Sequence, residues 1–180
     1  VKAAEEIMTA VHPTNDPQGT LLALTKALND TKNDRVREKV CGAIASIARS
    51  AEAQATCIRA GSEKVITAVL QTTTNERVME WACGAIANIA TSAEGKAACI
   101  KAGSEKVITA VLETTKDDRV REQACRAIYN ITFSDEGGAA CVKAGSEKVI
   151  AAVLGTTKDE RVRENACKAI HNIAGSVEGR

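Results

Sequence analysis

The sequence predicts an all-α solenoid built from tandem repeats. The segment AGSEKVI occurs three times, with its glycine at Gly61, Gly103 and Gly145, so that successive copies are 42 residues apart. A tandem period of this length is typical of a solenoid, in which each unit stacks on its neighbours to bury its apolar face. Apolar residues within each copy recur at spacings of three and four, which is the period of a helix and not of a strand.

The composition limits the core and the partners of the chain. Apolar residues make up 44% of the sequence and aromatic residues only 2%, so we expect a core of Ala, Ile, Val and Leu. The net charge of +1, from 24 basic and 23 acidic residues, gives no bulk reason to expect a nucleic-acid or membrane partner. The sequence contains neither a long apolar run nor a signal peptide, and we expect a soluble protein of the cytoplasm, the nucleus or both.

Each repeat is expected to contain a short first helix and a longer second helix. In the copy that begins at Glu94, the stretch EGKAACIKAG follows Ser92, a plausible N-cap, and ends at Gly103. A glycine can adopt the left-handed conformation that closes a helix. We expect Ser104 to cap the second helix, EKVITAVLET, with its side-chain oxygen.

A third helix, RVREQACRAIYNIT, follows the polar run TTKDD, with Asp117 as its expected N-cap. The equivalent caps of the other copies are Asn33, Asn75 and Asp159. The packed face of this helix is predicted to hold Val120, Ala124, Cys125, Ala127, Ile128 and Ile131.

The whole chain, residues 1–180, is interpreted as one array. Residues 1–17 form a partial unit, with a helix over 2–12 and a turn over 13–17, and an eroded second helix covers 20–28. Four repeats are assigned to 18–49, 50–91, 92–133 and 134–175, and 176–180 begin a further unit. We expect the chain to be a section of a longer array, whose open end favours end-to-end self-association.

The repeat unit resembles the armadillo repeat. The resemblance depends on AGSEKVITAVL and on the third-helix stretches VCGAIASIA (40–48), ACGAIANIA (82–90), ACRAIYNIT (124–132) and ACKAIHNIA (166–174). It implies a right-handed superhelix whose third helices line a concave groove, usually a binding site for extended peptides. HEAT repeats, with two helices per unit, are the nearest alternative, but the separate short helix ending in Ala-Gly favours three.

On a helical projection of the third helix, one predicted exposed stripe runs through four positions of each repeat, at about 100° per residue. The four columns of this stripe are Arg35, Arg77, Arg119 and Arg161; Lys39, Trp81, Gln123 and Asn165; Gly42, Gly84, Arg126 and Lys168; and Ser46, Asn88, Asn130 and Asn172.

The asparagine column carries the clearest functional implication of the resemblance. In armadillo proteins the equivalent asparagines hold the backbone of an extended peptide, because an amide offers both a donor and an acceptor. We therefore expect Asn88, Asn130 and Asn172 to bind peptide, whereas Ser46 departs from the pattern. The alternative is that each asparagine bonds its own helix or a neighbouring repeat.

The chain lacks the tryptophan column of importin-α-like repeats, since Gly42, Gly84, Arg126 and Lys168 stand at those positions. A nuclear-import groove is therefore not expected. Trp81, the sole tryptophan, lies one turn earlier, where it either anchors a partner or covers apolar surface between repeats.

The stripe is mildly basic, even with the flanking glutamates Glu38, Glu80, Glu122 and Glu164 counted. Arginine pairs bidentately with carboxylate and phosphate, so the stripe favours an acidic or phosphorylated peptide. In the alternative interpretation, each arginine pairs with a glutamate as a structural ladder.

The seven cysteines fall into two columns that we place on the packed face as reduced, apolar residues. Cys167 and His171 are four residues apart, but two ligands are too few for zinc. The carboxylates repeat as columns and do not converge, so we expect no enzyme activity, no cofactor and no metal.

Two other functions remain open beside a protein-interaction scaffold. One is nucleic-acid binding along the arginine column, disfavoured because aromatic residues for base stacking are nearly absent and the glutamates repel phosphates. The other is a structural spacer within a larger protein.

Overall fold

The computed structural model describes residues 17–176, and these form helices joined by short turns, with no strand among them. The helix expected over 2–12 lies outside the described residues, and so does the turn over 13–17 except for Pro17, which begins the first described helix. The unit expected to begin within 176–180 is described only at Ser176.

Three kinds of helix alternate along the chain. The short first helices are α4 (Ala51–Ala60), α7 (Ala93–Lys101) and α10 (Asp135–Lys143). The second helices are α2 (Pro17–Asp30), α5 (Ser62–Thr72), α8 (Ser104–Thr114) and α11 (Ser146–Thr156). The third helices are α3 (Asp34–Ile47), α6 (Glu76–Ile89), α9 (Asp118–Ile131) and α12 (Glu160–Gly175).

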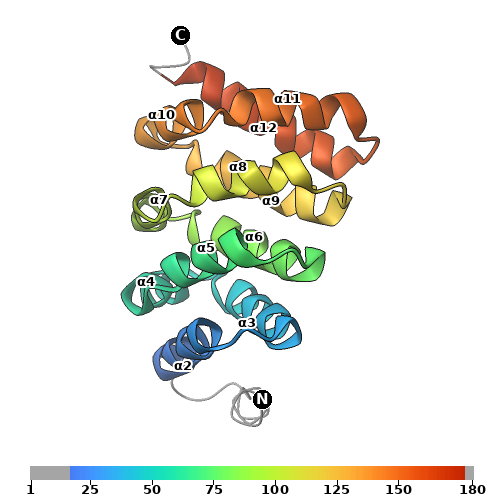
Figure 1. Ribbon diagram of the computed structural model, residues 1–180. Helices are drawn as coiled ribbons and strands as arrows, with labels where there is room; N and C mark the ends of the chain where they lie inside the picture. The colour runs from blue at the N-terminus through green and yellow to red at the C-terminus, as the bar shows by residue number, and fades with distance from the viewer. Residues whose placement is uncertain (1–16, 177–180) are drawn as a thin grey trace.

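Equivalent helices stack in layers along the axis of the solenoid. Figure 1 shows α4, α7 and α10 along one edge, with α5, α8 and α11 in front of the third helices. The most extensive contacts join each third helix to the next, from α3 through α6 and α9 to α12. The all-α solenoid with three helices per complete unit, predicted from the period and the separate short helix, is confirmed.

The predicted glycine turns and third-helix caps are confirmed. Gly61, Gly103 and Gly145 have φ values of 69°, 70° and 72°, the left-handed region in which a Cβ would be strained. The side chains of Asn33, Asn75, Asp117 and Asp159 accept hydrogen bonds from first-turn amides of the third helices. Ser92 likewise accepts from the amide of Gly95 at 3.0 Å.

The predicted role of Ser104 as a helix cap is wrong. Its hydroxyl lies 2.7 Å from Oγ1 of Thr67, one repeat earlier, and α8 has no side-chain cap. The single hydroxyl hydrogen of Thr67 is donated to the carbonyl of Glu63 at 2.7 Å, so Ser104 donates to Thr67. The same buried link joins Ser62 to Thr25 at 2.6 Å and Ser146 to Thr109 at 2.7 Å. The invariant serine therefore fastens successive second helices together.

The core is continuous along the axis and consists of small aliphatic residues. The packed face predicted for the third helix is confirmed, because all six of its residues are fully buried: Val120, Ala124, Cys125, Ala127, Ile128 and Ile131. Six of the seven cysteines are also buried, but the prediction for Cys167 is wrong. Cys167 is exposed because no described helix packs on the outer face of α12 as α12 packs on α9.

Among the described residues, no helix is both long and apolar enough to cross a membrane.

Candidate functional site

The third helices form a surface with a hollow that spans three repeats. The hollow has a volume of about 290 Å³ and receives side chains from α3, α6 and α9 and from the turn after α3. It is lined by Ala45, Ser46, Arg49, Glu80, Trp81, Gly84, Asn88, Gln123 and Arg126. Seven of these residues belong to the predicted stripe or flank it as glutamate, so the structure brings much of the predicted site together.

Trp81 forms one wall of the hollow and does not stand free. A Cβ added at Gly42 would lie 3.4 Å from Cδ2 of Trp81, so the indole of one repeat covers the glycine of the repeat before. In the same way, a Cβ at Gly84 would lie 3.4 Å from Oε1 of Gln123. Trp81 is half-buried and packs against the core, while part of its ring faces the hollow.

Asn88 and Asn130 use part of their hydrogen-bonding capacity within the array. Nδ2 of Asn88 donates to the carbonyl oxygen of Ala45 at 2.7 Å, and Nδ2 of Asn130 donates to that of Ala87 at 2.7 Å. Each bond joins one third helix to the third helix of the preceding repeat. An amide nitrogen carries two hydrogens, so one remains for a ligand. The bond between repeats that the sequence offered as an alternative is therefore present, and peptide binding stays a prediction.

Asn172 lacks this bond. The acceptor equivalent to Ala45 and Ala87 is the carbonyl of Tyr129, which accepts instead from Oγ1 of Thr132 at 2.8 Å. Nδ2 of Asn172 is buried without a hydrogen-bond partner among the described residues. Asn172 lines a second hollow, of about 240 Å³, together with the exposed Phe133.

Arg126 extends from α9 across to α6. Its Nη2 donates to Oδ1 of Asn88 at 3.1 Å and makes a longer contact of 3.4 Å with the carbonyl oxygen of Gly84. Its Nε is buried and has no partner among the described residues. Burial lowers the pKa of Arg126, an effect that Glu122 opposes and Arg49 reinforces. Arg126 is therefore a half-buried cation with spare donors and no carboxylate in contact.

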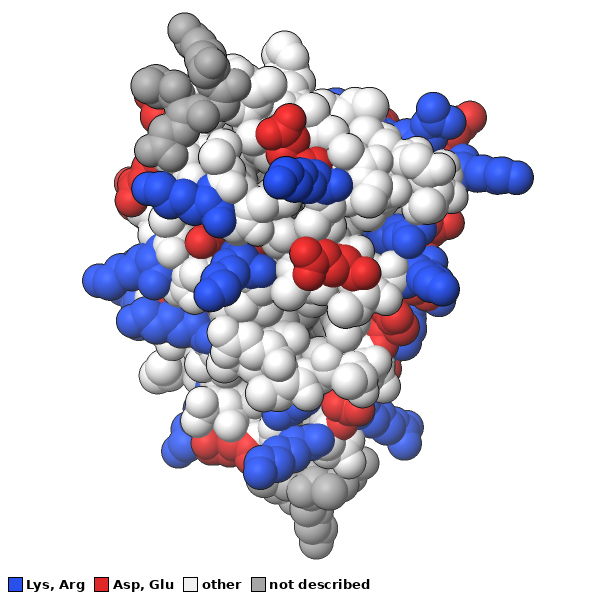
Figure 2. All heavy atoms as spheres, turned by 45° about the horizontal axis from the view of Figure 1, so that its top comes forward, with Lys and Arg blue, Asp and Glu red and all other residues white. Residues whose placement is uncertain are grey.

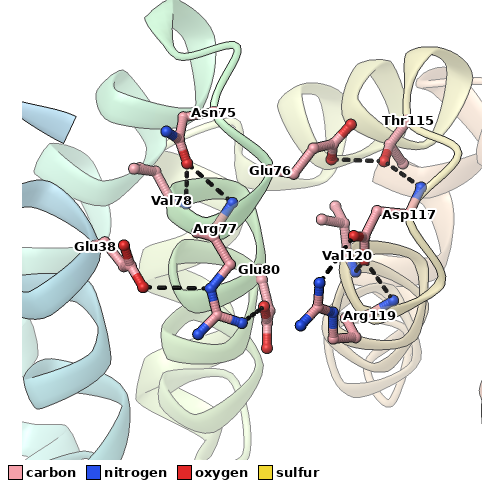
Figure 3. A network of polar contacts seen from close by, with 10 residues as sticks. All are labelled: Glu38, Asn75, Glu76, Arg77, Val78, Glu80, Thr115, Asp117, Arg119 and Val120. Atoms are coloured by element: carbon pink, nitrogen blue, oxygen red, sulfur yellow. Dashed lines mark hydrogen bonds and ion pairs between the residues drawn. The ribbon is translucent and has the colours of Figure 1, made fainter. Parts of the chain in front are cut away.

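The arginine column is only partly a ladder of ion pairs. Nε of Arg77 lies 3.3 Å from Glu38 of the preceding repeat, and its Nη1 lies 2.7 Å from Glu80. Arg119 instead contacts Asp117, the cap of its own helix, at 3.3 Å. Figure 3 shows Arg77 between its two glutamates and Arg119 turned toward the cap.

The other basic residues of the predicted site lie in the solvent. Arg35 and Arg161 are exposed and form no ion pair within the described range. Lys168 is held by Glu164 at 2.6 Å, with its ammonium 5.8 Å from the centre of the Tyr129 ring. Ser46 donates to the carbonyl of Gly42 in its own helix at 2.9 Å.

Charge on the wider surface is mixed. Figure 2 shows lysine and arginine side chains lying among aspartates and glutamates on the face that it presents. This face therefore carries no large area of a single charge sign.

The sequence interpretation missed Arg49. It lies just beyond the end of α3, outside the helix on which the columns were drawn, yet it lines the hollow. The stripe continued by one more step of three, from Ser46 to Arg49, would have identified it.

No three His, Cys, Asp or Glu side chains within 17–176 are grouped so that they could hold a metal ion. Burial raises the pKa of the Cys41 and Cys125 thiols to about 12, which keeps them protonated and unreactive.

Comparison with known proteins identifies the fold. No protein-family model matches the sequence, and no curated protein is similar to it. Among solved structures, one engineered protein is 32% identical with a TM-score of 0.80 over 87% of this chain and 63% of its own. Another engineered protein is 34% identical, with a TM-score of 0.80 over 88% of this chain and 38% of its own. This chain thus spans less than two thirds of either engineered protein.

A designed armadillo repeat protein in complex with the peptide (KR)4 is 29% identical to the chain. Its TM-score is 0.79 over 96% of this chain and 72% of its own. Stacked units of three helices, with a polar hollow across the third helices, define an α-helical repeat protein. More particularly, the chain has an armadillo-like repeat fold, as the sequence motifs predicted.

Proposed function

We propose that this chain is a protein-interaction scaffold that binds an extended, acidic or phosphorylated peptide across its third helices. One observation carries the proposal: a single hollow receives an indole, two amide side chains and two guanidinium groups from consecutive repeats. An extended chain that crosses successive third helices would meet these groups in turn. A designed protein of the same fold is in complex with a peptide, and another is described as designed for modular peptide recognition.

The charges of the hollow support an acidic ligand. Arg126 and Arg49 both line it, and neither contacts a carboxylate in the described structure, whereas Glu80 is already paired with Arg77. A basic peptide such as (KR)4 would place cations beside two guanidinium groups, so this chain should bind it poorly. The peptide (KR)4 therefore serves as the negative control for this chain.

The amides of Asn88 and Asn130 are suited to hold a peptide backbone. Each uses one amide hydrogen to fasten the array, and this bond fixes the orientation of the side chain before a ligand arrives. Preorganised donors lower the entropic cost of binding.

The proposal is tested by selecting peptides of about ten residues from a random library and measuring their affinity for the wild type and for a double variant, Asn88→Ala with Asn130→Ala. Each hydrogen bond contributes about 0.5 to 1.5 kcal/mol, so the double variant should lose about 1 kcal/mol or more of binding free energy. A matched amide deletion, Gln71→Ala on the exposed face of α5, should leave the affinity unchanged.

Because both asparagines also join adjacent repeats, thermal unfolding of the double variant must show that it is folded at the assay temperature. Unchanged affinity in the folded double variant would contradict the asparagine assignment. A library that yields no binder would contradict the scaffold proposal and leave the spacer interpretation.

Nucleic-acid binding gains no support from the described structure. Arg77 and Arg119 are both in contact with acidic side chains, so the column does not present free cations at regular intervals. Binding to single-stranded DNA that falls steeply between about 50 and 200 mM salt would reverse this view.

For the cellular location we propose the cytoplasm or the nucleus, which fluorescence microscopy of a tagged chain would test.

A further inference from the structure

Two arginines from different repeats line the hollow, and the side chain of neither contacts an acidic partner within the described structure. Arg126 comes from α9 and Arg49 from the turn after α3, and both line the same 290 Å³ space. Burial lowers the pKa of Arg126, and repulsion from Arg49 adds to this effect. Two like charges that line one hollow repel each other, and an anion bound between them would relieve this repulsion.

Most N–H donors of Arg126 have no acceptor among the described residues of the array. A guanidinium has five N–H donors, and within the described structure only Nη2 of Arg126 has partners, both neutral oxygens. The side-chain oxygen Oδ1 of Asn88 accepts from Arg126 and holds it against α6, while the bond that Nδ2 of Asn88 donates to Ala45 holds Asn88 itself. The guanidinium is thus held in place by groups that do not neutralise its charge.

The charge of the lining matches one carboxylate. Arg49 and Arg126 are the cations of the hollow. Glu80 also lines it, and because Arg77 is shared between Glu80 and Glu38, these three side chains together keep one negative charge, which leaves a single positive charge in all. A phosphate group, with nearly two negative charges, would exceed this balance, whereas a carboxylate completes it. The aliphatic stem of an acidic side chain could lie against the ring of Trp81, which forms the wall.

We infer that the hollow bounded by Arg126, Arg49 and Trp81 is an anchor pocket for one carboxylate side chain, glutamate or aspartate, of the ligand. The inference rests on the proposed function and sharpens it: charge selectivity lies at this pocket and not along the arginine column. Arg77 and Arg119 already contact carboxylates of the chain itself and contribute little to selection.

Trp81 provides a direct readout, because the protein contains no other tryptophan. In a ¹H–¹⁵N correlation spectrum the indole N–H gives one signal, and the Nε–H of Arg126 gives another. Titration with N-acetylglutamate amide should shift both signals in a saturable manner, whereas N-acetylglutamine amide should not. Arg126→Gln should weaken the binding of the glutamate probe by at least about tenfold, because hydrogen bonds between charged groups are the strong ones.

A second variant, Arg49→Gln, shows whether weaker binding by Arg126→Gln results only from a change in structure. The side chain of Arg49 is exposed and makes no hydrogen bond within the described range, so Arg49→Gln should fold as the wild type does and still weaken binding severalfold. Arg119→Gln is the matched control, since it removes the same charge from α9 outside the hollow, and it should bind the probe as the wild type does.

The outcomes separate the pocket from the scaffold. Equal shifts with the glutamate and glutamine probes, or unchanged affinity in both Arg126→Gln and Arg49→Gln, would overturn the pocket even if library peptides bind the groove. Tighter binding of N-acetylphosphoserine amide than of the glutamate probe, by tenfold or more, would overturn the choice of a carboxylate. If the glutamate probe binds as expected and no library peptide does, the pocket stands and the scaffold proposal fails.

Discussion

Glu63 is the least expected residue of the core at the scale of single side chains. It lies in the first turn of α5 with 2% of its surface exposed, and its Oε2 is buried with no hydrogen-bond partner among the described residues. Burial raises the pKa of this carboxyl above its ordinary value of 4.5, although its own backbone amide and Lys64 act in the opposite direction. Desolvation of the charged form thus exceeds the favourable interactions at this site.

We predict that Glu63→Gln stabilises the fold at neutral pH. A raised pKa in the folded state contributes stability that is fully present below the unfolded pKa and is lost as the pH rises through the folded value. The amide removes the cost of burying a charge, so unfolding by urea at pH 7 should show a gain of about 1 kcal/mol that shrinks toward pH 4.

Glu147 is the matched control, because it occupies the same position of α11 and is exposed. Glu147→Gln should change stability little at either pH. A loss of stability in Glu63→Gln at pH 7 would show that the ionised carboxylate is better solvated than its burial indicates.

Caps, glycine turns and packed faces can be predicted from the sequence by comparing positions 42 residues apart, because equivalent residues occupy the same local structure in each repeat. Asp117 and Gly103 were assigned in this way. The cap predicted at Ser104 is wrong, because the partner of its hydroxyl lies 37 residues earlier, on a different helix, and a local pattern cannot indicate it. The same limit applies to Arg126, whose contacts with Asn88 cross between repeats.

At the scale of the elements, the close packing of a first helix against the third helix before it requires a glycine, which has no side chain. A Cβ at Gly95 would overlap the carbonyl oxygen of Ile89 at the end of α6, and one at Gly137 would overlap that of Ile131. Backbone atoms cannot rotate away as a side chain can. The corresponding position in α4 holds Ala53, so the approach of α4 to α3 accommodates a methyl group that the later units exclude.

Gly95→Ala should therefore destabilise the array, by about 1 to 3 kcal/mol if α7 shifts to relieve the overlap. Gly155→Ala in α11 is the control: its added methyl group would meet no atom within 4 Å, and alanine is the better helix former by about 0.5 to 1 kcal/mol. Thermal unfolding should thus move in opposite directions for the two substitutions. A stabilised Gly95→Ala variant would mean that α7 packs farther from α6 than described.

At the scale of the whole molecule, each layer is protected by the layer that follows it. The third-helix cysteines form a column along the axis in which Cys41, Cys83 and Cys125 are buried, while Cys167 on the last described third helix is exposed. The first-helix cysteines Cys57, Cys99 and Cys141 are buried as well. Stacking, and not the local sequence, therefore decides which of seven similar thiols reaches the solvent.

This difference in exposure predicts that iodoacetamide at pH 8 adds a single label to the native protein, at Cys167. Burial raises the pKa of Cys57 to about 11 and that of Cys99 and Cys141 to about 12, so these thiols are both shielded and protonated at that pH. Mass spectrometry of the intact chain should show one adduct, and all seven thiols should react after denaturation in guanidinium chloride. Additional labelling of Cys141 would contradict the single adduct and show that α10 opens locally in the native protein. Uniform labelling of every cysteine at the rate of Cys167 would contradict the stacked core itself.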